Sequence, residues 1–262
     1  MKNHIHIIYV IILCLSIHIH GQNKHLQGIW VSGNNDVIKI NKDGDRFNIL
    51  STNETQEQLN LKISKDSLSF YTQYTKIGSD KTYVSEYNFY IKKITESKLI
   101  LIPTSKLSKD FFRNRKEITF TKQEFNLDNS ISFEKLIYRT TPCYGNCSSI
   151  NLELDKNKNI YIHRELFNDK INSGNFTGTL SENSYNKLIN ILQTSNLKTW
   201  SFPQKNGHDA PTTTLIIYYN GKRKYFKSMF PPTISQQLIN LLYQIGEKTE
   251  LIRTDKEKQL EY

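Results

Sequence analysis

Short apolar-polar alternations, uninterrupted by any helical repeat, constrain residues 26–122 more than any other feature of the chain. Each run lasts a few residues and ends in Ser, Asn, Asp, Gly or Pro, as strands joined by tight turns do. Asp43-Gly44 separates the first two runs and indicates a hairpin. The expected strands cover residues 38–41, 47–49, 59–63, 68–74, 83–91, 99–102 and 117–121.

Roughly eight consecutive strands without a helix favour an up-and-down barrel or a sandwich, since closing a sheet removes its exposed edges. We predict the barrel, over residues 22–124. Residues 26–30 read Leu-Gln-Gly-Ile-Trp, which resembles the Gly-X-Trp start of lipocalin-like domains, where the Trp plugs one end of the barrel. The resemblance implies a β-barrel but not a ligand cavity.

The first 21 residues are typical of a secretory signal peptide. Lys2 supplies a positive charge, residues 7–15 are almost wholly apolar, and Gly21 is a small residue before the expected cleavage point. One alternative is an uncleaved anchor, although the apolar run is shorter than the ~20 residues of a spanning helix. Another is lipoprotein processing at Cys14, which bulky Leu13 opposes. We expect an exported protein, periplasmic or extracellular, that does not span the membrane.

The charge pattern argues against nucleic acid as a partner. The chain has 262 residues, with Lys+Arg 35 against Asp+Glu 25 and a formal charge of +10. The basic residues are scattered, as on a solvated surface, and no DNA- or RNA-binding motif occurs. Nucleophile elbows, zinc-protease helices, phosphate loops and dinucleotide fingerprints are also missing from the sequence. We therefore predict no catalytic residues and no cofactor.

A different pattern begins after the polar stretch 125–132, which we take as a domain boundary. Strands are expected at residues 136–141, 150–154 and 160–167, with a shorter one near Phe176.

Two helices and a hairpin complete this second part. Ser181 can cap a helix whose apolar positions are 185, 188, 189 and 192, and a second helix follows Pro231-Pro232. Asn220-Gly221 between two strand-like runs indicates a type I′ turn. We predict an α+β domain over residues 133–247, with both helices on one face of an antiparallel sheet. The charged tail, residues 248–262, is expected to fray.

Two segments carry a family resemblance. Residues 139–147 read Arg-Thr-Thr-Pro-Cys-Tyr-Gly-Asn-Cys, and residues 206–211 read Asn-Gly-His-Asp-Ala-Pro. With the Asn-Gly hairpin, they resemble the domain of unknown function DUF6438 over residues 133–247. Ser148 stands where family members usually have Pro, which alters the turn but leaves both cysteines. The resemblance implies nothing about activity, because the family is itself uncharacterised.

Cys143 and Cys147 are the two cysteines that remain once the signal peptide is removed. An even number of cysteines in an exported protein favours a disulfide, and Gly145 allows the necessary bend. We predict a structural disulfide. The alternative is a redox or soft-metal site, since thiolates with a distant imidazole such as His208 suit copper(I) or zinc.

The remaining candidate residues have structural interpretations. His208 and Asp209 resemble a catalytic pair, but neighbours in an extended segment point to opposite sides, so Asp209 is expected in a turn or cap. Aromatic residues of the second part are expected to pack the sheet, with one of two consecutive tyrosines facing away from the covered side. These are Trp200, Tyr218, Tyr219, Tyr225 and Phe226.

The expected function is therefore non-catalytic binding in the cell envelope. A small apolar ligand or an envelope protein are the candidate partners. The alternative is a thiol-dependent redox or soft-metal-handling protein centred on Cys143 and Cys147, and a third possibility is an enzyme with its site at the domain junction.

Overall fold

The computed structural model describes residues 25–41, 47–143, 145–203, 207, 209–248 and 251–261. The chain divides into two compact units, Met1–Phe125 and Asn126–Tyr262. The expected signal peptide and the Asp43-Gly44 turn lie outside the described residues.

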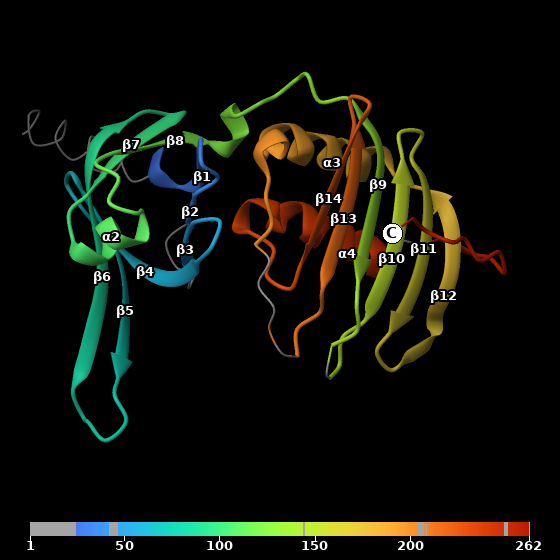
Figure 1. The fold of residues 1–262 in the computed structure, drawn as a ribbon, viewed down its shortest axis with the longest axis horizontal. Helices are drawn as coiled ribbons and strands as arrows, with labels where there is room; N and C mark the ends of the chain where they lie inside the picture. The colour runs from blue at the N-terminus through green and yellow to red at the C-terminus, as the bar shows by residue number, and fades with distance from the viewer. Residues whose placement is uncertain are drawn as a thin grey trace, which may run out of the picture. The chain divides into compact units, whose positions relative to one another are not determined.

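The first unit is a closed antiparallel barrel (Figure 1). Its strands are β1 (Gly28–Ser32), β2 (Val37–Ile40), β3 (Asn48–Ser51), β4 (Gln56–Ser64), β5 (Ser67–Thr75), β6 (Thr82–Ile94), β7 (Lys98–Pro103) and β8 (Ile118–Lys122). Each strand pairs with the next in sequence, and β8 closes the barrel by pairing with β1. The predicted up-and-down barrel is confirmed.

Large apolar side chains pack the described interior of the barrel. Trp30 is fully buried, its indole Nε1 donates to the Leu26 carbonyl at 2.8 Å, and the Lys122 ammonium lies 5.9 Å from the ring centroid. The other members of this core are Ile38, Ile40, Leu50, Leu59, Leu68, Phe70, Phe89, Ile91, Leu99, Leu101, Phe112, Ile118 and Phe120.

One helix interrupts the strands, where the sequence predicted none. Helix α2 (Lys106–Phe111) follows β7, and the Ser105 hydroxyl caps its N-terminus by accepting from the Ser108 amide at 3.2 Å. Phe112, at its C-terminal end, is fully buried in the barrel core. The prediction was wrong because six residues are too few to show a helical repeat.

The second unit holds a seven-stranded antiparallel sheet in the order β14-β13-β9-β10-β11-β12-β15. Its strands are β9 (Phe133–Thr140), β10 (Ser149–Asp155), β11 (Asn159–Leu166), β12 (Asp169–Thr179), β13 (Thr213–Tyr219), β14 (Lys222–Ser228) and β15 (Ile252–Arg253). Asn220 and Gly221 both have positive φ, 52° and 68°, so the predicted type I′ hairpin forms between β13 and β14.

Two helices lie on one side of this sheet (Figure 1). They are α3 (Glu182–Thr194) and α4 (Gln236–Lys248). The Ser181 hydroxyl caps α3 by accepting from the Ser184 amide at 3.3 Å, as predicted. Helix α4 packs closely on the sheet at Gly246, where a Cβ would lie 2.6 Å from Ile150. The predicted α+β architecture is confirmed.

A buried arginine ties helix α4 to the sheet. Arg164 of β11 is 6% exposed, and its guanidinium donates to the carbonyls of Asn172 at 2.8 Å, Gly246 at 2.8 Å and Glu247 at 3.0 Å. Burial lowers the pKa of Arg164. The Arg164 guanidinium therefore donates hydrogen bonds to the last carbonyl groups of α4, which carry partial negative charge.

The chain beyond α4 does not fray as expected. Strand β15 pairs with β12 at the sheet edge, and Leu260 is buried. Strand β12 is also longer than the short strand expected near Phe176. Its polar composition and its glycines conceal it in the sequence, and Gly174 has a φ of 123°, a backbone geometry that L-amino acids rarely adopt.

Candidate functional site

The face of the sheet opposite α3 and α4, here called the helix-free face, carries a row of polar side chains. Successive residues of a strand point to opposite faces, so Asn151 lies on the helix-free face because Ile150 packs against α4. The antiparallel register aligns Asn151 with Arg139 on one side and with His163 on the other, and His163 with Asn175. We call these four residues the polar row.

Hydrogen bonds hold the side chains of the polar row in place. The Arg139 Nε donates to Asn151 Oδ1 at 2.9 Å. Asn175 Oδ1 lies 2.7 Å from His163 Nδ1 and accepts from the Tyr161 hydroxyl at 2.9 Å. Because this amide oxygen is an acceptor, we assign the imidazole proton to Nδ1. The geometry leaves His163 Nε2 directed away from Asn175, 3.7 Å from a Glu165 carboxylate oxygen.

A groove of about 620 Å³ opens beside the polar row. Its floor is formed by the sheet and its opposite wall by residues 257–260. These belong to the segment 254–261, here called the strap. The strap approaches the sheet at Tyr161, whose hydroxyl accepts from the Lys258 amide at 3.0 Å. The lining residues are Arg139, Asn151, Tyr161, His163, Glu257, Lys258, Gln259 and Leu260.

The groove wall combines cationic and hydrogen-bonding groups with one carboxylate, that of Glu257. Arg139 offers a planar guanidinium, and His163 and Asn151 add polar groups from neighbouring strands. The half-buried positions of these side chains strengthen their electrostatic interactions relative to those in open water. Such a set can orient a carboxylate or phosphate group, which an arginine fork binds through paired hydrogen bonds.

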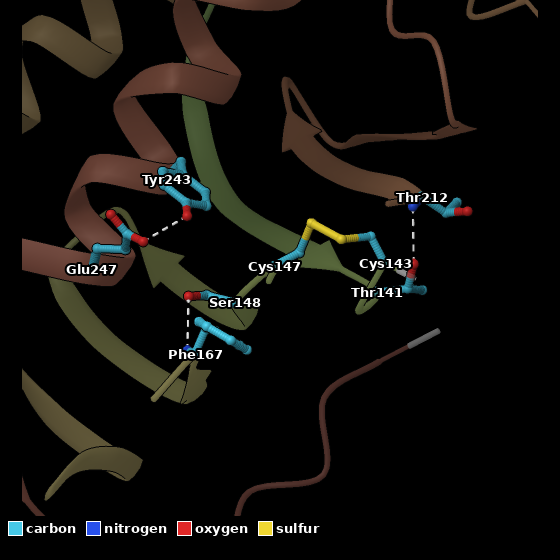
Figure 2. The surroundings of a disulfide bond; sticks show 8 residues. All are labelled: Thr141, Cys143, Cys147, Ser148, Phe167, Thr212, Tyr243 and Glu247. Carbon is cyan, nitrogen blue, oxygen red and sulfur yellow. Dashed lines mark hydrogen bonds between the residues drawn. A yellow bond between two sulfur atoms is a disulfide. The ribbon is translucent and has the colours of Figure 1, made fainter. Parts of the chain in front are cut away.

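The second notable feature is the disulfide in the loop between β9 and β10 (Figure 2). Cys143 and Cys147 are joined, with their Cα atoms 5.5 Å apart. The disulfide predicted from the sequence is confirmed. Gly145 between them has a φ of 151°, a value that L-amino acids rarely adopt.

Hydrogen bonds fix both ends of this loop to neighbouring segments. The Thr141 hydroxyl accepts from the Thr212 amide at 2.9 Å, and the Ser148 hydroxyl accepts from the Phe167 amide at 3.3 Å (Figure 2). Near Cys147, the Tyr243 hydroxyl donates to Glu247 at 2.5 Å, and burial followed by this bond raises the pKa of Tyr243. The disulfide therefore belongs to an ordered set of contacts around the start of β10.

Comparison with known families identifies a large part of the second unit. Residues 134–247 match the domain of unknown function DUF6438. This part of the chain is a DUF6438 domain. No curated protein and no solved structure matches the chain. The polar row and the disulfide lie within the DUF6438 domain, whereas the strap lies beyond the matched residues.

Of the sequence pair His208-Asp209, the structure describes Asp209 alone. His208 lies outside the described residues. Asp209 is exposed and has a φ of 65°, a left-handed backbone geometry typical of turns.

The aromatic residues of the DUF6438 domain mostly pack in its interior. Trp200 is buried, its ring centroid lies 5.8 Å from that of Phe226, and its indole donates to the Ser195 carbonyl at 2.5 Å. Tyr219 is buried while Tyr218 lies on the helix-free face, so the expected split between the consecutive tyrosines is confirmed. Tyr225, in contrast, is 47% exposed.

The sequence pattern did not predict the polar row. Each member is a single polar residue within a strand, and only the successive pairings of β9 with β10, β10 with β11 and β11 with β12 bring them together. The one visible hint was the alternation of polar and apolar residues in β10 and β11.

Two further observations concern the described part of the chain. No three His, Cys, Asp or Glu side chains gather there as metal ligands would. Among the same residues, no helix combines the length and apolar character required to cross a membrane.

Proposed function

We propose that the protein is an exported, non-catalytic binding protein of the cell envelope, and that the groove of the DUF6438 domain is its binding site. The polar row carries this proposal. Its side chains are oriented by cross-strand hydrogen bonds on the sheet, and three of them, Arg139, Asn151 and His163, line a groove whose volume suits a small molecule.

The ligand best suited to the groove presents a carboxylate or phosphate group. Arg139 supplies a charged fork, and Asn151 and His163 add hydrogen-bonding groups from neighbouring strands. Apolar ligands fit the barrel less well, because its described interior is occupied by packed side chains such as Phe70, Phe89 and Phe120.

Export is supported by two independent features. The apolar N-terminal stretch has the composition of a signal peptide, and disulfides such as Cys143–Cys147 persist mainly in oxidising compartments. The test is the N-terminus of the protein recovered from its producing cells, measured by mass spectrometry. Removal of residues 1–21 is expected, and a recovered protein that retains Met1 would refute export by a cleaved signal.

Ligand binding is tested by thermal unfolding of the intact protein with a panel of succinate, citrate, inorganic phosphate and glucose 6-phosphate. A ligand present at about 100 times its Kd stabilises the folded protein by about 2.7 kcal/mol. We expect at least one compound to raise the Tm of wild type and of Lys227→Gln, an exposed control on β14, but not of Arg139→Gln. Failure of the whole panel, or stabilisation of Arg139→Gln equal to that of wild type, would contradict the proposed site.

The second candidate is a thiol-dependent redox protein centred on Cys143 and Cys147. The bond between these residues is the observation that favours it. The two candidates differ in the expected reactivity of the disulfide, which the reduction potential of the bond between Cys143 and Cys147 measures.

A further inference from the structure

The strap is anchored on the helix-free face at successive side chains of different chemistry. Lys258 forms an ion pair with Glu153 at 2.5 Å, and Leu260 is 7% exposed. Glu261 accepts a hydrogen bond from the Tyr218 hydroxyl. A basic, an aliphatic and an acidic residue of one extended segment thus each meet a matching group on the sheet.

The site for Leu260 is an apolar cluster on an otherwise polar face. Leu260 packs with Ile137, Ile216 and Tyr161, which are themselves buried, and Tyr218 borders the cluster. Ile137 and Ile216 are paired across β9 and β13, so the cluster is part of the sheet itself. Without Leu260, two isoleucine side chains on this face would be exposed to water, which costs about 25 cal/mol for each Å² uncovered.

The site for Glu261 is a cluster of donors. Arg223 Nε lies 3.1 Å from one carboxylate oxygen and Lys135 Nζ lies 3.4 Å from the other. The hydrogen bond from Tyr218, followed by the contacts with Lys135 and Arg223, lowers the pKa of Glu261. Because Lys135 also lies 4.7 Å from the centroid of the Tyr218 ring, the three donors form one cluster on β9, β13 and β14.

An apolar contact for one side chain and a charged contact for the next are typical of surfaces that bind extended peptides. We propose that the helix-free face binds extended peptides with the pattern basic-x-aliphatic-acidic, and that the strap occupies this site within the same chain. The site adjoins the groove and shares Tyr161 with it, but it extends further across the sheet, since Ile137, Ile216 and Arg223 are outside the groove lining. A partner peptide of this pattern competes with the strap for the surface.

The probe is a fluorescently labelled peptide with the sequence of residues 251–261, and the measurement is fluorescence anisotropy. One receptor is the intact wild-type chain. The other is the intact chain carrying Leu260→Ser and Glu261→Gln, which weakens the strap and keeps every sheet and helix residue. We expect the variant to bind the peptide at least about tenfold more tightly than wild type, because a tethered segment competes at a millimolar effective concentration.

Peptide variants identify the contacts that matter. Leu260→Ala in the peptide should weaken binding at least about tenfold through loss of apolar burial, and Glu261→Gln by about threefold. Lys256→Ala is the matched control, because the exposed side chain of Lys256 takes part in none of the anchoring contacts described above, and it should change binding less than about twofold. Equal binding of all peptides, or a folded receptor variant that binds none, would overturn the proposal.

A second test uses the wild-type protein, so it does not require that any variant folds. With ¹⁵N-labelled chain and excess unlabelled peptide, displacement moves the amide signals of residues 254–261 to unstructured positions, and unmoved signals at saturating peptide would refute the proposal. Arg139→Gln should leave peptide binding intact while removing small-anion binding. A failure of the groove and a failure of the peptide site are therefore distinguishable.

Discussion

Replacing both cysteines by serine separates a structural disulfide from a redox-active one. The bond closes a loop of only a few residues, from Cys143 to Cys147. In the chain-entropy description, closing a five-residue loop removes about 7 cal/mol/K from the unfolded chain, or about 2 kcal/mol near room temperature. We therefore expect Cys143→Ser with Cys147→Ser to lower the free energy of unfolding of the DUF6438 domain by about 2 kcal/mol without abolishing its fold.

The two tryptophans make the measurement specific to one unit. Trp30 lies in the barrel core and Trp200 is buried in the DUF6438 domain. In a Trp30→Phe background, guanidinium unfolding followed by fluorescence reports on Trp200 alone. Reduction of the protein with its cysteines intact is the matched control, because it opens the same loop without a substitution and should produce the same loss of stability.

Two results would refute this reasoning. One is a serine variant as stable as the oxidised parent, which would show that the bond does not constrain the unfolded chain. The other is a reduction potential within the roughly −120 to −270 mV range of thiol-exchange catalysts. That value would favour the redox candidate, because structural disulfides in exported proteins resist reduction more strongly.

Two further predictions concern buried and surface charges of the second unit, Asn126–Tyr262. Arg164→Met leaves the carbonyls of Asn172, Gly246 and Glu247 without their charged donor, so guanidinium unfolding should show a loss of about 3 kcal/mol, and an unchanged midpoint would contradict this. Asp128 has its pKa lowered to about 2 by hydrogen bonds from Lys198 and Ser130. Because the folded pKa lies below the unfolded one, its stabilisation is complete above about pH 4 and is lost as the pH falls toward about 2. Asp128→Asn should therefore flatten the pH dependence of unfolding in that window, and identical acid unfolding of both proteins would refute the assignment.

Local signals in the sequence were sufficient for much of the fold. The Asn220-Gly221 turn, the Ser181 cap and the run of short strands each depend on neighbouring residues alone, and all three form as predicted. Elements without a local signal were missed. Helix α2 is too short to show periodicity, and β12 is polar and contains glycine.

The candidate sites depend on pairing between distant segments. Arg139 and Asn175 are far apart in sequence, and the order of β9, β10, β11 and β12 in the sheet places them in one row. The charged composition of residues 248–262 suggested a solvated tail, whereas Leu260 and its two charged neighbours on the strap each meet a partner on the sheet. Composition alone does not reveal such complementarity.

We propose that the polar row of the helix-free face binds an anionic ligand. The most direct test is NMR of the side-chain nitrogens of Arg139 and His163 in the intact protein, titrated with succinate and with inorganic phosphate. We expect saturable shifts of Arg139 Nε and of the His163 imidazole with at least one of the two anions, while Arg164, on the opposite face, remains unchanged. Constant shifts of Arg139 and His163 up to saturating concentrations of both anions would contradict it.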